Sequence, residues 1–248
     1  MKVSIITVTL NSDKYLEECI NSVIGQDYNN IEHIIIDGKS SDGTVEIIKK
    51  YEKHLSHWLS EKDIGMYDAI NKGIELAKGD IIGLLNSDDL LASNDVISII
   101  VKVFAEQKVD SIFGDLQYVE ADDTKKLYRT WKDKAYNRKR FLSGWMPAHP
   151  TFYLKRTCIE KYGGYENHYY TAADYEFMAR YLYKYRLSAF YIPKLIVTMR
   201  RGGQSNKNLF KRLRANRRDF LAMKKNDIPF PFLVSILKPL SKLHQYLK

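Results

Sequence analysis

Short runs of β-branched residues alternate with stretches of helical periodicity up to about residue 115. The runs are VSIITV, IEHIII, HWLS, DIIGLL and DSIFGD, and the helical stretches are residues 13–25, 44–54, 66–78 and 94–107. Strands and helices in alternation predict a mostly parallel central sheet with helices over both faces. We therefore expect a Rossmann-like α/β unit in the first half of the chain.

The pattern becomes irregular and rich in aromatic residues after residue 115. A hairpin is expected within LQYVEADDTKKLYRTW, a loop at GWMPAHP, and a helix within TAADYEFMARYL, where Tyr175, Met178 and Leu182 mark a buried stripe. No stretch rich in Pro, Gly or Ser separates the two halves. Residues 1–205 are therefore expected to form one compact domain, with halves at 1–115 and 116–205.

The remaining residues, 206–248, form a basic tail. The 248-residue chain has a net charge of +9, and residues 207–248 hold 11 Lys or Arg against 2 Asp or Glu. Apolar residues recur there at helical spacing: Leu209, Phe210, Leu213, Phe220 and Leu221, then Leu233, Ile236, Leu237, Leu240, Leu243 and Leu247. Basic amphipathic helices of this kind are typical of segments that lie on an anionic membrane. The alternative is that the apolar faces pack on the domain.

Composition argues against several other classes of protein. No apolar run approaches the roughly 20 residues of a membrane-spanning helix, and the 45% apolar content is ordinary for a soluble protein. Cys19 and Cys158 lie far apart without CxxC spacing, so neither a disulfide framework nor a zinc site is indicated. The N-terminal MKVSIITVTLN is predicted to be a first strand and not a signal peptide. A cytoplasmic location is expected.

Polar residues cluster at the expected carboxyl ends of the strands, where parallel α/β sheets bind their ligands. They are Asn11, Asp37, Asp63 and the run from Asn86 to Asp89. Asp88 and Asp89 end an apolar strand abruptly, and such carboxylates can hold Mg²⁺ or Mn²⁺ beside a substrate phosphate. The alternative is a plain turn before the next helix. Neither GxGxxG nor GxxxxGK[ST] is present, which disfavours NAD and P-loop ATP chemistry.

Seven motifs, each present once, follow one another over residues 1–205. They are VSIITVTLNSDKYLEECINSVIGQ, IIIDGKSSDGT, DIGMYDAINKGIELAKGD, LLNSDD, FGD, AHPTFYLKR and AADYEFMARYL. Through them the chain resembles the family 2 glycosyltransferases of GT-A fold, in the bacterial subgroup that builds O-antigen and related surface polysaccharides. The resemblance implies an inverting, metal-dependent enzyme that moves a hexose or N-acetylhexosamine from a nucleotide diphosphate sugar, a UDP-sugar above all, to a lipid-linked saccharide.

The resemblance also implies roles for single residues. The implied contacts to the nucleotide sugar are Val8, Thr9, Asn11, Asp37, Asp63, Asn71, Asn86, Ser87 and Asp88. Asp88 and Asp89 are the implied ligands of Mn²⁺ or Mg²⁺. Asp174 matches the base that deprotonates the acceptor hydroxyl, although an isolated helical Asp is often only a surface residue. His149, Arg200 and Arg201 are candidate contacts to the acceptor or the diphosphate, and His149 is equally consistent with a core histidine.

Two departures from the family pattern stand at the donor site. Asn86 replaces the usual first Asp of the DxD motif, and Ala69-Ile70-Asn71 replaces the common ARN triplet, which removes an arginine that could meet the phosphates. Lys62, Lys72, Arg200 or Arg201 could substitute for it.

The implied organisation has a nucleotide-sugar-binding half at 1–115, an acceptor-binding half at 116–205 and a membrane-associating tail at 206–248. An enzyme of this kind would lie peripherally at the inner face of the plasma membrane. A GT-A-like nucleotidyltransferase and a basic nucleic-acid-binding protein remain alternatives. The first normally shows a Gly-rich, Arg-bearing loop where LNSDKYL stands, and the second leaves Asp37, Asp63, Asp88 and Asp89 unexplained. We expect no nucleic-acid partner, and a homo-oligomer stays open.

Overall fold

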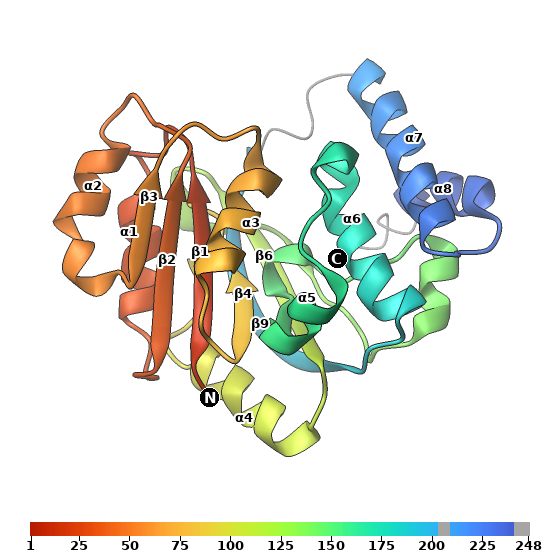
Figure 1. Cartoon of the computed structure of the whole chain (residues 1–248), viewed down its shortest axis with the longest axis horizontal. Helices are drawn as coiled ribbons and strands as arrows, with labels where there is room; N and C mark the ends of the chain where they lie inside the picture. Colours follow the sequence, from red (N-terminus) through yellow and green to blue (C-terminus); the bar gives the residue numbers. More distant parts are fainter. Residues whose placement is uncertain (203–208, 241–248) are drawn as a thin grey trace.

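The computed structural model describes residues 1–202 and 209–240 of the chain. Its first half holds four parallel strands in the order β3-β2-β1-β4. Their bounds are β1 Val3–Thr9, β2 Ile31–Asp37, β3 His57–Ser60 and β4 Ile81–Leu84. The arrowheads of β1 and β2 point to the same end of the sheet in Figure 1. The carboxyl ends of these strands therefore share one edge.

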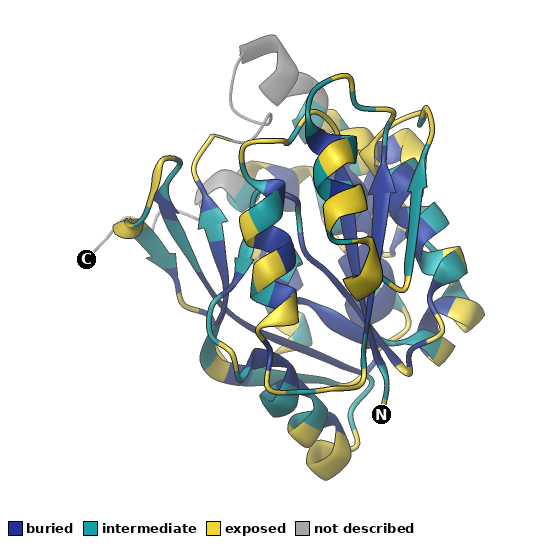
Figure 2. Ribbon diagram, turned by 90° about the vertical axis from the view of Figure 1, so that its left-hand side faces the viewer, coloured by how far each residue is buried: buried dark blue, intermediate teal, exposed yellow. Residues whose placement is uncertain are grey.

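Helices cover both faces of this parallel part. They are α1 Leu16–Ile24, α2 Thr44–Lys50, η1 Glu52–His54, α3 Met66–Leu76 and α4 Val96–Gln107. Ile35 of β2 packs with α1 and α2, whereas Ile34 and Ile36 pack with α3 on the opposite face. Figure 2 shows buried strands between helices whose outer faces are exposed. Alternate residues of β2 thus serve two separate cores, because successive side chains of a strand point to opposite faces.

Close packing of α3 on the sheet depends on one glycine. A Cβ atom at Gly73 would lie 2.4 Å from Cγ2 of Ile6 in β1. A side chain at this position would push the helix away from the strand, so Gly73 fixes the distance between α3 and the sheet.

The second half of the sheet is mixed. Beyond β4 the order continues β8-β6-β9-β5, and β7 pairs with β6. The pairings β4–β8, β6–β8, β5–β9 and β6–β7 are antiparallel, and only β6–β9 is parallel. The bounds are β5 Leu90–Leu91, β6 Ser111–Glu120, β7 Asp123–Trp131, β8 Tyr153–Lys155 and β9 Ala189–Arg200. Parallel pairing of neighbouring strands is therefore concentrated in the first half.

Short helices fill the second half. They are η2 Arg138–Ser143, η3 His149–Thr151, α5 Arg156–Tyr162, η4 Asn167–Ala172, α6 Ala173–Met178 and η5 Ala179–Lys184. Tyr175, Met178 and Leu182 are fully buried, which confirms the expected stripe. Burial is not confined to that stripe, because Ala173, Glu176 and Phe177 are also buried.

Two helices follow, α7 Leu209–Lys225 and α8 Pro231–Leu240. They lie beside α6 in Figure 1. Ala222, Met223, Ile228 and Val234 join the same core cluster as α3 and α6. A Cβ atom at Gly144 would lie 2.5 Å from Cβ of Lys238, so α8 also sits tightly on the segment after η2. Within the described residues, the helices of the expected tail therefore pack on the domain.

The apolar stripe expected for the tail faces away from the domain in the first turns of α8. Leu233 and Ile236 are exposed, whereas Val234 and Ser235 are buried. The alternative, that the stripe packs on the domain, does not hold for Leu233 and Ile236, because α8 packs on η2 and α6 through another side. Leu209, Phe210, Leu213, Leu240, Leu243 and Leu247 lie outside the residues whose side chains the structure describes.

Several helix boundaries also differ from expectation. α1 begins at Leu16 and not at residue 13, and α4 begins at Val96. The helix expected at 44–54 ends at Lys50 and continues as the separate turn η1. The α/β architecture, the hairpin between β6 and β7 and the position of each predicted strand are confirmed. Among residues 1–202 and 209–240, no helix is both long and apolar enough to cross a membrane.

Candidate functional site

Asp37 ends β2 and organises the loop that follows it. Its carboxylate accepts hydrogen bonds from the Ser40 backbone N–H at 3.0 Å, from the Ser40 hydroxyl and from the Ser60 hydroxyl at 2.5 Å. Ser60 is the last residue of β3, so one carboxylate joins two strand ends. Asp37 is fully buried, and its position at the carboxyl edge agrees with the expected place for a nucleotide.

The end of β1 adjoins this loop. The Asn11 backbone N–H donates to the Ser40 hydroxyl at 2.8 Å, and Asn11 Oδ1 accepts from the Ser41 N–H at 2.9 Å. Asn11 has a φ of 51°, which a short polar residue tolerates better than most. Val8 is half-buried, whereas Thr9 is buried and its hydroxyl has no hydrogen-bond partner among the described residues. Asn11 therefore links the ends of β1 and β2.

Asp63 lies on the other side of the same edge. A Cβ atom at Gly38 would lie 3.2 Å from Asp63 Oδ2, so the carboxylate approaches the backbone directly after Asp37. Lys72 of α3 pairs with Asp63 and Glu61, each at 2.6 Å. Asp63 and then Glu61 raise the pKa of Lys72 above its usual value. Lys72 is thus committed to carboxylates, which weakens it as a substitute for the missing arginine.

The loop after β4 holds two carboxylates in different surroundings. Asp89 is fully buried, and its Oδ2 accepts from the Asn86 amide at 2.7 Å, while its Oδ1 is buried with no partner among the described residues. Asp88 is only half-buried. The Ser87 hydroxyl contacts that of Ser12 at 3.0 Å, which ties the loop to the segment after β1. Asn86, in the place of a family Asp, holds the buried carboxylate.

The environment of this pair suits a cation. Burial raises the pKa of Asp88, and burial together with the charge of Asp88 raises the pKa of Asp89. The nearby charge of Arg200 opposes this rise only in part. Two neighbouring carboxylates that are both shielded from solvent gain from a bound cation. Asp88 and Asp89 therefore fit the expected metal, with Asp88 the more accessible. No group of three His, Cys, Asp or Glu side chains suited to a metal occurs in the described chain, so phosphate oxygens would have to complete the coordination.

Arg200 supports this loop from the far end of the chain. Its guanidinium donates to the Asp88 carbonyl at 2.8 Å and pairs with Glu18 of α1 at 2.7 Å, and it lies over the Tyr15 ring. The side chain is only 3% exposed. Arg201 instead pairs with Glu120 at 3.5 Å and lies over Tyr128 of the β6–β7 hairpin. The geometry makes Arg200 a support of the Asp88 loop.

A second polar group gathers around Asp174 at the start of α6. His149 Nε2 lies 2.9 Å from the Tyr165 hydroxyl, and Tyr67 of α3 stacks on Tyr165. Burial lowers the pKa of His149, and the nearby charge of Asp174 partly opposes this. Burial and then Asp174 raise the pKa of Tyr67. Burial therefore favours the neutral form of His149, and the charge of Asp174 acts on both His149 and Tyr67.

Asn71 pairs with the backbone of Tyr165. Its Nδ2 donates to the Tyr165 carbonyl and its Oδ1 accepts from the Tyr165 N–H, both at 2.8 Å. Its amide is thus paired with the backbone of the segment that carries Tyr165. Asn71 connects α3 of the first half to the Asp174 group of the second, while donor contact at Asn71 stays a prediction.

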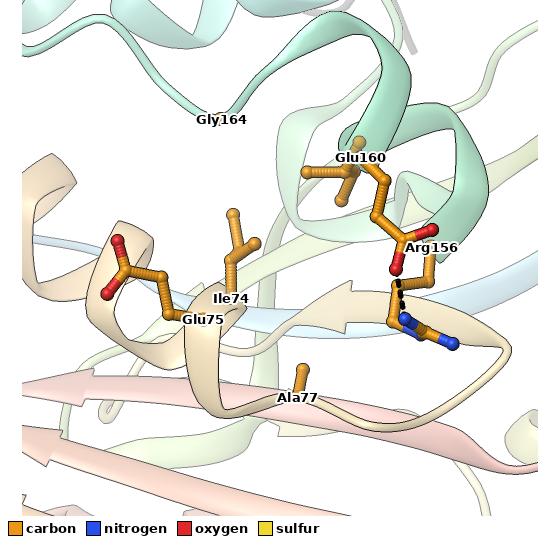
Figure 3. Close-up of a pocket in the computed structure, with 7 residues that line it drawn as sticks. Ile74, Glu75, Ala77, Arg156, Glu160 and Gly164 are labelled. Carbon is orange, nitrogen blue, oxygen red and sulfur yellow. Dashed lines mark hydrogen bonds and ion pairs between the residues drawn. The ribbon is translucent and has the colours of Figure 1, made fainter.

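Two hollows of the described surface differ in their position relative to the strand ends. The larger, of about 310 Å³, lies between α3 and α5 and includes Ile74, Arg156 and Glu160, as Figure 3 shows. It adjoins the C-terminal end of α3, at the edge opposite to the strand ends, and the Arg156–Glu160 ion pair closes part of it. The smaller, of about 260 Å³, is lined by Arg200, Glu18 and Tyr15. Because Arg200 binds the Asp88 carbonyl, the smaller hollow borders the Asp88 loop and lies nearer to the candidate site than the larger one does.

Comparison with known proteins decides the family. The model described as "Glycosyl transferase family 2" matches residues 4–163. The chain belongs to glycosyltransferase family 2. An uncharacterized glycosyltransferase of Mycobacterium tuberculosis is 33% identical over 72% of this chain and 68% of its own length. A PGL/p-HBAD biosynthesis glycosyltransferase of Mycobacterium bovis is 28% identical over 85% of this chain and 83% of its own. As a family 2 glycosyltransferase, the chain uses a nucleotide-sugar donor.

Solved structures confirm the GT-A-like fold of this glycosyltransferase. S. aureus TarS 1–349 superposes with a TM-score of 0.75 over 100% of this chain and 75% of its own, at 18% identity. The same fragment in complex with UDP-GlcNAc gives 0.66 over 100% and 76%, at 17% identity. The mannosyltransferase PcManGT of Pyrobaculum calidifontis, in complex with GDP-Man and Mn²⁺, gives 0.66 over 98% and 70%, at 19% identity.

Several residues of the site were not predicted from the sequence. Tyr67 lies within DIGMYDAIN, beside residues that were singled out, and its place in the first turn of α3 was the available signal. Tyr165 belongs to a tyrosine-rich stretch in which no single ring stands out. Glu18 is an ordinary acidic residue of an amphipathic helix, and only the fold brings it to Arg200.

Proposed function

We propose that this glycosyltransferase is inverting and metal-dependent. It transfers a hexose or N-acetylhexosamine from a UDP-sugar to a hydroxyl of a lipid-linked saccharide in the biosynthesis of a bacterial surface polysaccharide, O-antigen or capsule. The observation that carries the proposal is the desolvated pair Asp88 and Asp89 at the edge that also holds Asp37. The UDP and UDP-GlcNAc complexes of the similar TarS fold support the choice of nucleotide.

Different strand ends would contact different parts of the nucleotide sugar. Asp37, fixed by Ser40 and Ser60, is placed to accept hydrogen bonds from the base or ribose. Asn11 and Ser87 border the same edge. A buried carboxylate that already accepts several hydrogen bonds keeps its position when the nucleotide sugar binds. Binding therefore costs little side-chain entropy at Asp37.

Asp88 and Asp89 would hold Mn²⁺ or Mg²⁺, with Asp88 the more accessible of the two. The Asn86 amide would keep the Asp89 carboxylate in position by donating a hydrogen bond to it. When bound, the cation neutralises charge that develops on the departing diphosphate. Arg200 holds the Asp88 backbone in place. The Mn²⁺ in the PcManGT complex supports a metal in this fold.

Asp174 would act as the base. It takes the proton of the acceptor hydroxyl while that oxygen forms a bond to the anomeric carbon, and the bond from that carbon to the diphosphate oxygen breaks with its electron pair. A single displacement from the opposite face inverts the anomeric configuration. His149, neutral and anchored on Tyr165, would orient the hydroxyl without adding charge.

The acceptor assignment has support of a different kind. The resemblance to enzymes of surface polysaccharides favours a lipid-linked saccharide, and the basic residues at 207–248 favour an anionic surface. Such an enzyme would act peripherally at the inner face of the plasma membrane.

Nucleotide release with Mn²⁺ and a panel of UDP-, GDP- and dTDP-sugars tests the proposal. We expect release from a UDP-sugar, loss of it in excess EDTA, and its absence in Asp88→Ala. Asp123→Ala, an exposed carboxylate on β7, is the matched control and should behave as the wild type. Full activity in excess EDTA would overturn the metal assignment.

A further inference from the structure

Large apolar side chains gather on the outside of the α7–α8 turn. Five of them are exposed: Leu221 at 44%, Phe230 at 77%, Phe232 at 70%, Leu233 at 54% and Ile236 at 47%. We name this surface the α7–α8 ridge. Among the described large apolar residues, only Ile64 is more exposed than Phe230. Phe232, Leu233 and Ile236 are neighbours at helical spacing on α8. Exposed apolar side chains that lie together mark an interaction site more often than scattered single residues do.

The ridge is held outward by the packing beneath it. Ile228 and Val234 are buried in the core, and they alternate with the exposed Phe230, Phe232 and Leu233. Phe230 has a φ of 52°, a conformation that an aromatic residue rarely adopts. Strain of this kind persists only where the surroundings enforce it, and it is often found at functional sites. The exposed rings are therefore a fixed feature of the fold.

Positive charge accompanies the ridge. Arg217 and Lys224 of α7 are exposed, and Lys225 is exposed but pairs with Glu166. In the sequence, residues 207–248 hold 11 Lys or Arg against 2 Asp or Glu. Apolar residues beside a cluster of basic ones suit the boundary between lipid headgroups and acyl chains. Unpaired bases can stack on phenylalanine rings, but nucleic acid offers no counterpart to the aliphatic Leu221, Leu233 and Ile236 on the same ridge. The basic residues beside the ridge would repel those of a second copy of this chain.

We propose that the α7–α8 ridge inserts into an anionic lipid bilayer and thereby seats the acceptor-binding half on the membrane. The inference rests on the proposed function for the identity of the acceptor, and its surface combines Leu221, Leu233 and Ile236 of the stripes that the sequence suggested with Phe230 and Phe232. Leu233 and Ile236 belong to the ridge with Phe230 and Phe232, whereas Val234 anchors α8 to the protein.

A buried polar network joins the ridge to the candidate base. Asn226, at the end of α7, donates from Nδ2 to Glu176 Oε1 at 3.2 Å, and Glu176 Oε2 pairs with Arg180 at 3.1 Å. Glu176 lies two residues after Asp174 on α6. On the other side, Lys238 of α8 pairs with Asp219 at 2.6 Å and lies over the Tyr175 ring. The ridge and Asp174 therefore keep a fixed relation, so docking sets the height of the base above the bilayer.

Flotation of the full chain with vesicles tests the inference. The vesicles are phosphatidylglycerol mixed with phosphatidylcholine, and phosphatidylcholine alone. We expect binding to the anionic vesicles that high salt weakens, and a loss of at least tenfold in the double variant Phe230→Ser/Phe232→Ser. Leu127→Ser, which removes a 57% exposed apolar residue from β7, is the matched control and should bind as the wild type.

UDP-sugar binding, measured by calorimetry on each variant, separates folding from docking and should be unchanged. Equal vesicle binding by the double variant and the wild type would overturn the inference. A wild-type dimer that the double variant dissociates, without a change in vesicle binding, would show that a second copy covers the ridge and would also overturn it. Ridge-dependent vesicle binding without transfer to any lipid-linked saccharide would retain the inference and contradict the proposed function.

Discussion

The two halves of the sheet achieve rigidity in different ways. In the half that holds β1 to β4, backbone pairing of parallel strands brings Asp37 and the Asp88 loop to one edge. In the other half, side chains hold irregular backbone: Arg180 donates to the carbonyls of Tyr162, Gly163 and Gly164 and pairs with Glu176. The edge that carries Asp37 and the Asp88 loop thus follows from topology, whereas the segments around Asp174 depend on a few buried polar contacts.

This difference gives the halves different tolerance to substitution. A strand-end residue can change without loss of the strand pairing beneath it. A residue of the Arg180 network cannot, because a buried group that loses its partner retains the cost of desolvation. We therefore expect substitutions at the strand ends of the parallel half to affect chemistry first and those in the Arg180 network to affect folding first. Asp174, the proposed base, is the exception in the second half, since its substitution is expected to affect chemistry first.

The largest effect is expected for Asp174→Asn. The amide keeps the shape of the carboxylate but accepts no proton, so transfer should fall by about two to four orders of magnitude. Donor affinity and thermal stability should remain near those of the wild type. Steady-state rates with a saturating acceptor, together with calorimetric titration of the UDP-sugar, measure both. Turnover at the wild-type rate would assign the base to another group.

The next effect concerns stability alone. Arg180→Met leaves Glu176, which is fully buried, without its cationic partner. Removing one member of a buried pair destabilises a protein by about 3–5 kcal/mol. Urea unfolding measures the change. Lys50→Met breaks the exposed Lys50–Glu17 pair of the donor half and serves as the control, for which we expect little change. Equal losses in the two variants would contradict the contrast between the halves.

The secondary structure of the first half could be predicted from the sequence more fully than the contacts of the second half. Period-two and period-3.6 patterns depend on neighbours in the chain, so β1 to β4 and the helices between them could be placed from the sequence. The pairing of Asn71 with Tyr165 joins residues 94 positions apart, and no local pattern encodes it. The tail shows the limit most clearly, because spacing groups Leu233 and Ile236 on one side of α8 but does not tell whether that side faces the domain or away from it.

The candidate residues divide in the same way. Asp37, Asp63, Asp88 and Asp89 were predicted because polar residues that follow apolar strands must lie at one edge. Asp174 came from family resemblance, and the aromatic group around it emerged only from the fold. The resemblance did not reveal that Arg200 already binds the Asp88 carbonyl and Glu18.

A smaller effect is expected for Asn71→Ala. The change leaves the N–H and C=O of Tyr165 without their partners, and each buried unpaired group costs about 1–3 kcal/mol. Because Tyr165 holds His149, transfer should fall more than donor affinity does. Urea unfolding and separate titrations of donor and acceptor test this. Asn21→Ala, an exposed asparagine of α1 that donates to Tyr51, is the control. A selective loss of donor affinity would instead favour the nucleotide contact expected from the sequence.

The smallest effect is expected in the parallel half of the sheet and tests how tightly that half excludes water. His33 of β2 is buried against the Thr7 hydroxyl, and burial lowers its pKa from 6.5 to about 4. The folded state therefore resists protonation that the unfolded state accepts. The stability that depends on neutral His33 is fully present above pH 6.5 and is lost as the pH falls toward 4, at about 1 kcal/mol per pH unit. His33→Gln keeps a hydrogen-bonding side chain but does not titrate, so the difference in unfolding free energy between it and the wild type should change with this slope.

His54→Gln, at an exposed position of η1, should leave the wild-type pH dependence intact. A pH-independent difference would mean that water reaches the His33 ring, and that the parallel half is less tightly closed than its strand pairing implies.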